Sequence, residues 1–211
     1  MNKYAHVEEL IKRYPALADN EGAIKSACDT IDKCYQNGGK ILIAGNGGSA
    51  ADSEHIVGEL MKGFVKQRRI PDAFAKKLGI IDADAACILK NNLQQGIHAI
   101  ALCGHPALST AYLNDVEGTV GFAQQVYGYG KDGDVLIAIS TSGNSQNIIY
   151  AAITAKAMGL GVIGLTGKTG GKLKGYCDEV IMVPETEPYK VQEYHLPVYH
   201  AICLELEERF F

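Results

Sequence analysis

Five short apolar runs, rich in β-branched residues, recur along the chain, and none of them alternates cleanly between polar and apolar positions. Strands that are buried on both faces have this pattern, as in a parallel sheet covered by helices. The runs therefore predict five strands, at Lys40–Ala44, His98–Cys103, Asp134–Ile139, Gly161–Leu165 and Glu179–Val183.

Segments with helical periodicity separate these runs. The clearest is Glu21–Gln36, which repeats apolar side chains at helical spacing and stops before a pair of glycines, a typical helix end. Similar patterns predict helices at Ser49–Met61, at Ser145–Met158 and from about Tyr189 to Phe210, where Pro197 predicts a kink. This alternation predicts an α/β fold, a three-layer sandwich around a five-stranded parallel sheet with helical segments at both ends.

Residues 62–97 fit this alternation least well. They contain two short helical patterns, Asp72–Leu78 and Asp84–Leu93, and no clear strand. They could form a lid, an interface element or a long crossover. Because the chain has no internal repeat and no low-complexity linker, we expect one domain over residues 1–211, with a helical N-terminal segment at 1–37.

Composition and charge exclude several classes of protein. No apolar run approaches the roughly 18 residues that cross a bilayer, and no secretion core follows Met1, so we expect a cytoplasmic protein without membrane contact. A net charge of -4 argues against a nucleic-acid partner, and we interpret the cluster of Lys66, Arg68 and Arg69 as a solvated face. The six cysteines show no metal-binding spacing and are interpreted as small, mostly buried side chains.

A glycine loop, Gly45–Ala50, lies between a predicted strand and a predicted helix. It satisfies the G-x-G-x-x-A pattern of dinucleotide-binding folds, but such folds also need a carboxylate at the end of the second strand, which here ends at His105. We therefore expect no nucleotide cofactor. The segment Gly167–Thr169 resembles the end of a nucleotide P-loop, yet Val162 stands where its first glycine is required, so we interpret it as a turn.

A hydroxyl loop, Ser140–Ser145, follows the third predicted strand and opens the next helix. Hydroxyls and free backbone N–H groups at a helix N-terminus bind phosphate without lysine or arginine, because the helix supplies the positive end of a dipole. The alternative is an ordinary polar turn in which Ser145 caps the helix.

Two pairs of side chains could perform acid–base or metal chemistry. His55 and Glu59 lie four residues apart and share one helix face, and Gln192 and His200 lie about two turns apart on the last helix. Such a set could bind a divalent ion through nitrogen and oxygen, or could move a proton at a substrate carbon. Alternatively, His55 and Glu59 form a surface pair and His200 is a hydrogen-bonded core histidine.

Four separated motifs, in the same order along residues 41–200, together resemble the phosphoheptose isomerases, a family built on the sugar isomerase (SIS) domain. Residues 62–97 lie outside the resemblance. The matching residues are Gly45–His55 with Glu59 and Leu60, the pair Asn114 and Asp115, the hydroxyl loop Ser140–Ser145, and Gln192, Glu193, His195 and His200.

The resemblance implies a flavodoxin-like SIS domain that forms a homotetramer with active sites at subunit interfaces. It implies a phosphorylated sugar as substrate and one Zn²⁺ in each active site. The implied catalytic residues are Glu59 and His200, and the implied metal ligands are His55, Glu59, Gln192 and His200. The implied substrate-binding residues are Asn46, Gly47, Gly48, Ser49, Glu59, Asn114, Asp115, Ser140, Thr141, Ser142, Ser145 and Gln192.

The reaction that the resemblance implies is an isomerisation of sedoheptulose 7-phosphate to glycero-manno-heptose 7-phosphate through an enediol intermediate. We expect Glu59 to act as the base at carbon and His200 as the partner acid. A tightly held zinc ligand cannot also be a mobile base. Either Glu59 binds zinc loosely while the ion polarises the substrate oxygens, or the ion is structural or inhibitory.

The chain departs from the family in two places. Tyr189 stands where the family commonly has an acidic residue, three positions before Gln192, and residues 62–97 are longer than the usual connection. Two other functions stay open. One is a non-catalytic SIS protein, either a phosphosugar sensor or a DnaA-binding replication-initiation partner, and the other is an isomerase of a different ketose phosphate.

Overall fold

A computed structural model describes residues 3–211 and confirms the predicted five-stranded parallel sheet. The strands lie in the order β2-β1-β3-β4-β5, which is the flavodoxin-like order. Each runs parallel to its neighbours, with Ile41 of β1 beside both Ala99 of β2 and Val135 of β3. The strands are β1 (Ile41–Ala44), β2 (Ala99–Ala101), β3 (Val135–Ser140), β4 (Gly161–Thr166) and β5 (Glu179–Met182).

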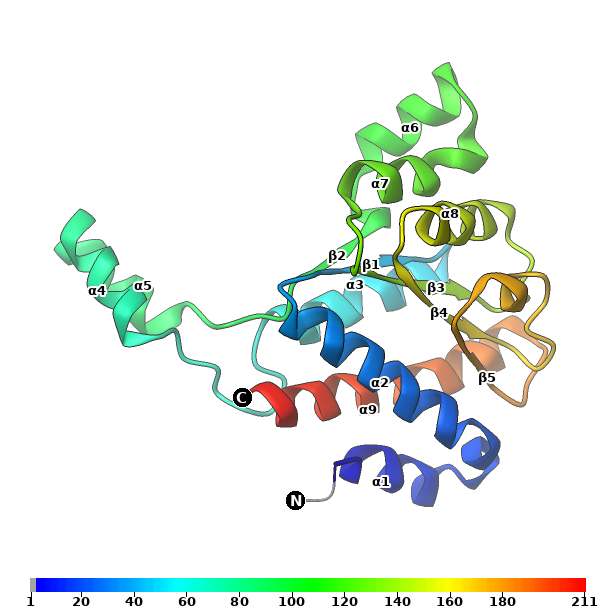
Figure 1. Cartoon of the computed structure of the whole chain (residues 1–211), viewed down its shortest axis with the longest axis horizontal. Coiled ribbons are helices and arrows are strands. Elements are labelled where there is room, and N and C mark those ends of the chain that lie inside the picture. The colour runs from blue at the N-terminus through cyan, green and yellow to red at the C-terminus, as the bar shows by residue number, and fades with distance from the viewer. Residues whose placement is uncertain (1–2) are drawn as a thin grey trace.

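Helices cover both faces of the sheet, so the predicted three layers are present (Figure 1). One face packs against α2 (Glu21–Gln36), α3 (Gly48–Met61) and α9 (Pro188–Phe210), with α1 (Ala5–Arg13) outside them. The other face packs against α7 (Gly121–Tyr129) and α8 (Gln146–Ala157). Short 3₁₀ turns complete the chain at Pro15–Asn20, Leu102–Gly104, Gly118–Val120 and Leu173–Tyr176, called η1 to η4.

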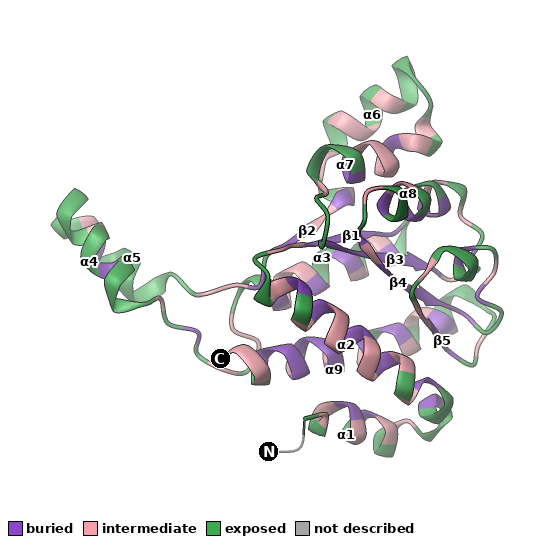
Figure 2. Ribbon diagram, viewed as in Figure 1, coloured by how far each residue is buried: buried purple, intermediate pink, exposed green. Residues whose placement is uncertain are grey.

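Alternate residues of each strand enter opposite layers, which explains the continuous apolar runs in the sequence. Ile41 and Ile43 belong to the core beneath α2, α3 and α9, whereas Leu42 and Ala44 belong to the core beneath α8. Figure 2 shows that the strands and the inner sides of α2 and α9 are buried. The second strand is shorter than expected, because the chain turns into η2 after Ala101.

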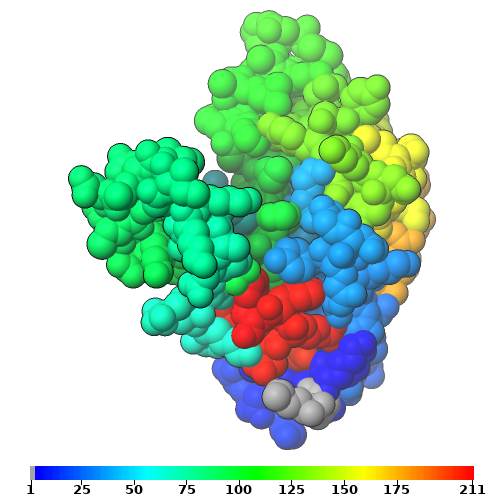
Figure 3. Space-filling view, turned by 60° about the vertical axis from the view of Figure 1, so that its left-hand side comes forward, coloured from blue at the N-terminus to red at the C-terminus, as the bar shows by residue number. Residues whose placement is uncertain are grey.

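Residues 62–97, here called the arm, form a helical hairpin that stands out from the body (Figures 1 and 3). It consists of α4 (Asp72–Ile81) and α5 (Ala83–Asn92), which pack mainly against each other. Both helices were expected, and neither passes across the sheet as a crossover helix would. Apolar side chains on the arm stay exposed, with Ile80 at 85% and Ile81 at 83% of their full accessibility.

Two further features concern the helices. The last helix continues through Pro197 as one element, and the predicted kink there stays a prediction. The helix α6 (Pro106–Asp115) follows η2 and lies at the top of Figure 1; among residues 3–211 it is one of the helices without a buried residue. In that same range no helix combines the length and apolar character needed to cross a membrane.

All six cysteines are free: Cys28, Cys34 and Cys203 are buried, Cys103 and Cys177 are partly buried, and Cys87 is exposed.

Candidate active site

The hydroxyl loop is held by hydrogen bonds within itself at the carboxyl end of β3. Ser140 Oγ donates to Ser145 Oγ at 3.0 Å, and Asn144 N donates to Ser142 Oγ at 3.1 Å. Gly143 has a φ of +66°, and a Cβ there would overlap the backbone of the glycines at 170 and 171. Only glycine fits this combination of conformation and crowding.

Ser145 occupies the N-cap position of α8, but its side chain makes no capping hydrogen bond. The alternative in which Ser145 caps the helix is therefore wrong. Because the first N–H groups of a helix have no partner within the helix, the start of α8 keeps donors for an anion. The loop therefore offers hydroxyl and amide groups that a phosphate could bind, and its role as a phosphate site stays a prediction.

The glycine loop lies at the carboxyl end of β1, beside the hydroxyl loop. Asn46 and Asn147 exchange two side-chain hydrogen bonds, of 2.9 and 2.8 Å, which join the glycine loop to the first turn of α8. Strands β1 and β3 are neighbours in the sheet, and the order of the strands reverses there. Ligands of open α/β sheets bind at such a switch point, outside the carboxyl ends of the strands.

The start of α3 is in close contact with the start of α9. A Cβ on Gly48 would lie 2.6 Å from Gln192 Nε2, so the Gln192 amide packs directly against this glycine. Gly47 has a φ of +56°, which other residues rarely adopt. Of the neighbouring candidates, Asn46 is exposed and Ser49 is buried. The structure therefore brings Gln192 to the glycine loop.

Farther along the same two helices, the structure brings together three of the predicted residues, here called the catalytic cluster: His55, Glu59 and His200. His55 Nε2 lies 3.3 Å from Glu59 Oε1 and 3.4 Å from His200 Nε2. His55 is 42% exposed and Glu59 is 13% exposed at the side chain, so the cluster opens to the surface. The core-histidine alternative is wrong for His200, which is partly exposed; the buried histidine is His195, whose Nε2 lies 3.3 Å from Thr166 O.

Two residues that the sequence analysis missed support His55 from behind. Tyr199 Oη lies 2.9 Å from His55 Nδ1 and donates to Asp52 Oδ1 at 3.3 Å. Burial raises the pKa of the Asp52 carboxyl and of the Tyr199 hydroxyl. Burial, followed by the neighbouring His55, lowers the pKa of His200, which favours its neutral form. The i, i+3 spacing of Asp52 and His55 on α3 was the signal in the sequence that could have found Asp52.

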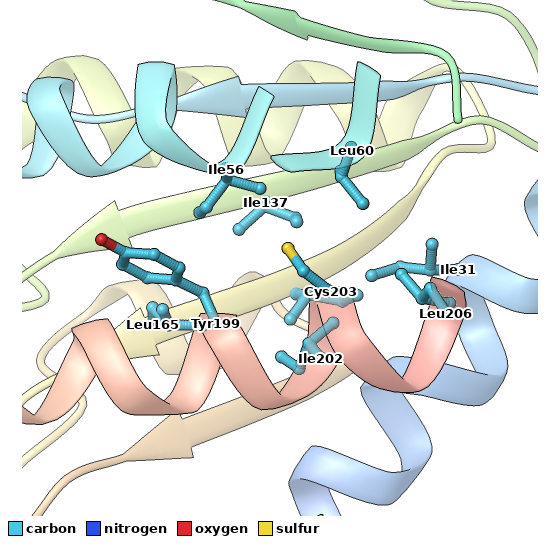
Figure 4. Close-up of a pocket in the computed structure, with 10 residues that line it drawn as sticks. Ile31, Ile56, Leu60, Ile137, Leu165, Tyr199, Ile202, Cys203 and Leu206 are labelled. Atoms are coloured by element: carbon cyan, nitrogen blue, oxygen red, sulfur yellow. The ribbon is translucent and has the colours of Figure 1, made fainter. Parts of the chain in front are cut away.

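The cluster rests on an apolar core between the sheet and the two helices (Figure 4). Ile56 and Leu60 of α3 face Cys203 and Leu206 of α9 across a space of only about 10 Å³. The Tyr199 ring belongs to this core, and in Figure 4 its hydroxyl points away from the apolar side chains. Tight packing of this kind fixes the two helices relative to each other and so fixes the distances within the cluster.

Two predicted substrate-binding residues, Asn114 and Asp115, make no contact with the catalytic cluster of the same chain. Asn114 and Asp115 are exposed near the end of α6, where Asn114 Nδ2 donates to Asp115 Oδ1 at 2.6 Å. The principal contacts of α6 are with α7 and η3. As to metals, among residues 3–211 no group of three or more His, Cys, Asp and Glu side chains is arranged to hold an ion.

The interpretation of Lys66, Arg68 and Arg69 as a solvated face is wrong for Arg68. Its side chain is fully buried, and its Nε donates to Glu207 Oε1 at 2.8 Å. Glu207 is itself 0% exposed, although it lies only four residues from the end of the chain. Sequence reasoning had no signal for this pair, because the two residues are far apart in the chain and both are of types that usually stay exposed.

Comparison with known proteins gives a family match. A model of the SIS domain family matches residues 4–77 and 90–167, which leaves out the middle of the arm. The phosphoheptose isomerase of Aneurinibacillus thermoaerophilus is 38% identical over 216 aligned residues, covering 100% of this chain and 96% of the relative. The phosphoheptose isomerase of Clostridium acetobutylicum is 37% identical, covering 89% of this chain and 83% of the relative.

Solved structures agree with these relatives. The phosphoheptose isomerase GmhA from Neisseria gonorrhoeae superposes with a TM-score of 0.75 at 32% identity, covering 97% of this chain and 96% of that one. A phosphoheptose isomerase from Francisella tularensis gives a TM-score of 0.74 at 29% identity, covering 95% and 94% of the two chains. Similarity therefore extends over nearly the whole length of these proteins.

Proposed function

The chain belongs to the phosphoheptose isomerases of the SIS domain family, and we propose that it interconverts sedoheptulose 7-phosphate and glycero-manno-heptose 7-phosphate. The observation that carries the proposal is the meeting of Glu59, His55 and His200 from two helices that are distant in the sequence. A carboxylate beside two imidazoles has the groups that proton transfer at carbon requires, and a protein that only binds a phosphosugar has no need of them.

In the proposed reaction Glu59 removes a proton from C1 of the open-chain ketose, and the electron pair forms the C1–C2 double bond of an enediol. His200, as the partner acid, supplies a proton to the former carbonyl oxygen at C2. Return of a proton to C2, with loss of the proton from the hydroxyl at C1, gives the aldose. No atom is gained or lost, so the reaction needs no redox partner or nucleotide.

The two loops hold the other end of the substrate. We assign the phosphate to the hydroxyl loop, with Ser140, Thr141, Ser142 and Ser145 and the start of α8 as donors. We assign binding of the sugar hydroxyls to the glycine loop and to Gln192, whose side chain contacts Gly48. Gly48 and Glu59 lie about 16 Å apart along α3 at the helical rise. We propose that the substrate lies along this helix, with its phosphate toward the loops and its C1–C2 end toward the cluster.

Zinc is part of the proposal, with His55, Glu59 and His200 as its ligands and Glu59 bound loosely enough to act as the base. Gln192, the fourth residue of the implied set, lies at Gly48 and would have to turn toward the cluster to join them. Two donors on a tetrahedral zinc, each about 2.0–2.1 Å from the ion, lie about 3.3–3.4 Å apart. The His55–Glu59 and His55–His200 separations of 3.3 and 3.4 Å have this length, and imidazole with carboxylate is a donor set that suits zinc. Bound there, the ion would polarise the substrate oxygens.

We further propose a cytoplasmic homotetramer with active sites at subunit interfaces. Two features support it: α6 buries no residue within residues 3–211, and the arm leaves large apolar side chains exposed. Apolar surfaces of this kind mark interaction sites. A second subunit could cover the arm and bring Asn114 and Asp115 to a neighbouring cluster. Analytical ultracentrifugation of wild type and of the double variant Ile80→Ser, Ile81→Ser tests this, and a wild-type monomer contradicts it.

The experiment for the function is incubation of the purified protein with sedoheptulose 7-phosphate, with and without added Zn²⁺, followed by identification of the products. We expect formation of the aldose heptose 7-phosphate. Binding of the sugar phosphate without turnover under both conditions would contradict the isomerase and favour the sensor. Turnover of a different ketose phosphate only would keep the reaction and change the substrate.

A further inference from the structure

Beneath the catalytic cluster, one buried ion pair ties together the three segments that position it. The pair is Arg68, at the base of the arm, and Glu207, near the end of α9; their side chains are 0% and 1% exposed. Removing two charges from water is expensive, and a buried pair of this kind is weak evidence of added stability. What it contacts therefore says more about its role than the fact that it is buried.

Arg68 binds the end of the helix that carries His55 and Glu59. Its Nη1 donates to Leu60 O at 2.7 Å and its Nη2 donates to Glu59 O at 3.1 Å. These carbonyls lie in the last turn of α3, where a helix has no internal donors for them and where its dipole attracts a cation. The guanidinium thus holds the backbone of the residue whose carboxylate is the proposed base.

Glu207 binds the segment that leads from α3 into the arm. Its Oε1 accepts from Phe64 N and Arg68 Nε, both at 2.8 Å, and its Oε2 accepts from Val65 N at 2.9 Å and Lys66 N at 3.1 Å. A carboxylate has about four acceptor sites, so these donors saturate it. Burial raises the pKa of Glu207, but these donors outweigh it and hold the pKa below its usual value, so Glu207 is charged at neutral pH.

The same segment touches the other catalytic residue. The Phe64 ring lies 5.3 Å from the His200 ring, centroid to centroid, while Phe64 N is held by Glu207. The pair therefore contacts Glu59 through its carbonyl and His200 through Phe64. It also places α9, the helix of His200, at a fixed distance from the end of α3.

We propose that Arg68 and Glu207 are positioning residues for the isomerisation, which set the distance between Glu59 and His200 without touching the substrate. The inference rests on the proposed function. Loss of the pair should displace Glu59 and His200 while leaving the hydroxyl loop, at the far end of α3, intact. Misplacement of reacting groups by about 1 Å costs on the order of a hundredfold in rate.

The test compares Arg68→Gln, Arg68→Lys and Glu207→Gln with wild type at a temperature at which circular dichroism shows every variant folded. We expect kcat to fall at least about tenfold in Arg68→Gln and Glu207→Gln, with KM changed by less than about threefold, because displaced reacting groups slow the chemical step and leave the phosphate-binding loop intact. Arg68→Lys keeps the charge but not the fork of donors, and it should lie between these variants and wild type.

The matched control is Arg209→Gln, on the same helix. Arg209 is 11% exposed and pairs with Asp29 at 2.9 Å and Asp32 at 3.2 Å, away from the cluster. This variant should lose stability and keep the kcat of wild type. If Arg68→Gln behaves like Arg209→Gln, with lower stability and unchanged kcat, the pair is merely structural and the proposal is wrong.

A second measurement is independent of turnover. In protein labelled with ¹³C and ¹⁵N at histidine, the ring resonances of His55 and His200 should shift in Arg68→Gln and stay in place in Arg209→Gln. If wild type does not isomerise sedoheptulose 7-phosphate, the proposed function fails, and these resonances still decide whether the pair positions the cluster. Unshifted resonances in Arg68→Gln overturn the positioning role.

Discussion

The hydroxyl loop and the catalytic cluster are built in opposite ways. The loop is a run of consecutive residues between β3 and α8, and the hydrogen bonds within it connect residues two to five positions apart. Outside contacts come from the segment 167–173, where Lys172 N donates to Asn144 Oδ1 and Leu173 N donates to Gly143 O. The cluster takes His55 and Glu59 from α3 and His200 from α9, and its members meet only because both helices pack on the same face of the sheet. The groups proposed for phosphate binding are thus consecutive in the sequence, whereas the groups proposed for catalysis come together only through tertiary packing.

This difference has a consequence for substitutions. A change in the loop should alter how tightly the phosphate is held and leave the reacting groups in place. A change in the cluster, or in the contacts behind it, should alter the rate and leave binding of the phosphate largely intact. The two regions should therefore separate in kinetics, as KM effects and kcat effects.

The largest effect should come from Glu59→Gln, which keeps the shape of the side chain and removes the base. General acid–base catalysis contributes about 10²- to 10⁴-fold, so we expect a loss of kcat of that order with binding of the sugar phosphate largely retained. Product formation and calorimetric binding measure the two quantities separately. Glu54→Gln, an exposed position on the same helix, is the control. A fully active Glu59→Gln variant would show that another residue is the base.

A smaller effect, of the opposite kind, should follow from Gly143→Ala. Gly143 has a φ of +66° and lies against the backbone of Gly170 and Gly171. Forcing a non-glycine residue into this region costs on the order of 1–3 kcal/mol. At 1.4 kcal/mol per factor of ten this corresponds to a rise in KM of about 5- to 150-fold, with kcat much less affected. Gly22→Ala, in an open position on α2, should leave KM unchanged. A selective fall in kcat would break the separation between the two regions.

Ser145→Ala should give a still smaller effect on the same region, because it removes one hydroxyl and its bond with Ser140 Oγ. A hydrogen bond contributes about 0.5–1.5 kcal/mol, which corresponds to a rise in KM of about two- to tenfold. Steady-state kinetics of the variant and of wild type measure this change in KM. The control is Thr154→Ala, on the same helix, whose hydroxyl donates to Tyr150 O within α8. An unchanged KM would remove Ser145 from the phosphate site.

The last and smallest expected effect is on stability rather than on rate, and it concerns the ionisation of Glu207 in acid. Its pKa in the folded protein lies below the value of 4.5 for an ordinary glutamate, because the donors around it outweigh its burial. The stability that this carboxylate contributes is therefore full above that value and is lost as the pH falls through the lower folded-state pKa. Urea unfolding of wild type and Glu207→Gln is measured between about pH 3 and 7 at one protein concentration. The free energy of unfolding should fall less toward acid pH in the variant than in wild type. If the free energy of unfolding falls equally in both proteins, Glu207 does not contribute to the acid sensitivity of the fold.

The fold was predictable because its signals are short in range. All five strands and the helices α2, α3, α8 and α9 lie where their apolar periodicity placed them, within a few residues. The arm was recognised as two helices, but its projection from the body was not, since a helical pattern does not say what the helix packs against. The helices α6 and α7 were not predicted. Among residues 3–211, α6 has no buried residue, so its sequence carries no apolar periodicity that could have indicated a helix.

The sequence by itself determined the five apolar runs that form the sheet's core, the two loops at the carboxyl ends of β1 and β3, and the helix faces that carry His55, Glu59 and His200. It could do so because a loop conformation and a helix face depend on neighbours within a few positions. Only the tertiary structure decided that Tyr199 and Asp52 support His55, and that Arg68 is buried against Glu207. Partners so far apart in the chain meet only after the helices pack on the sheet, and a charged residue carries no local sign that it will be buried.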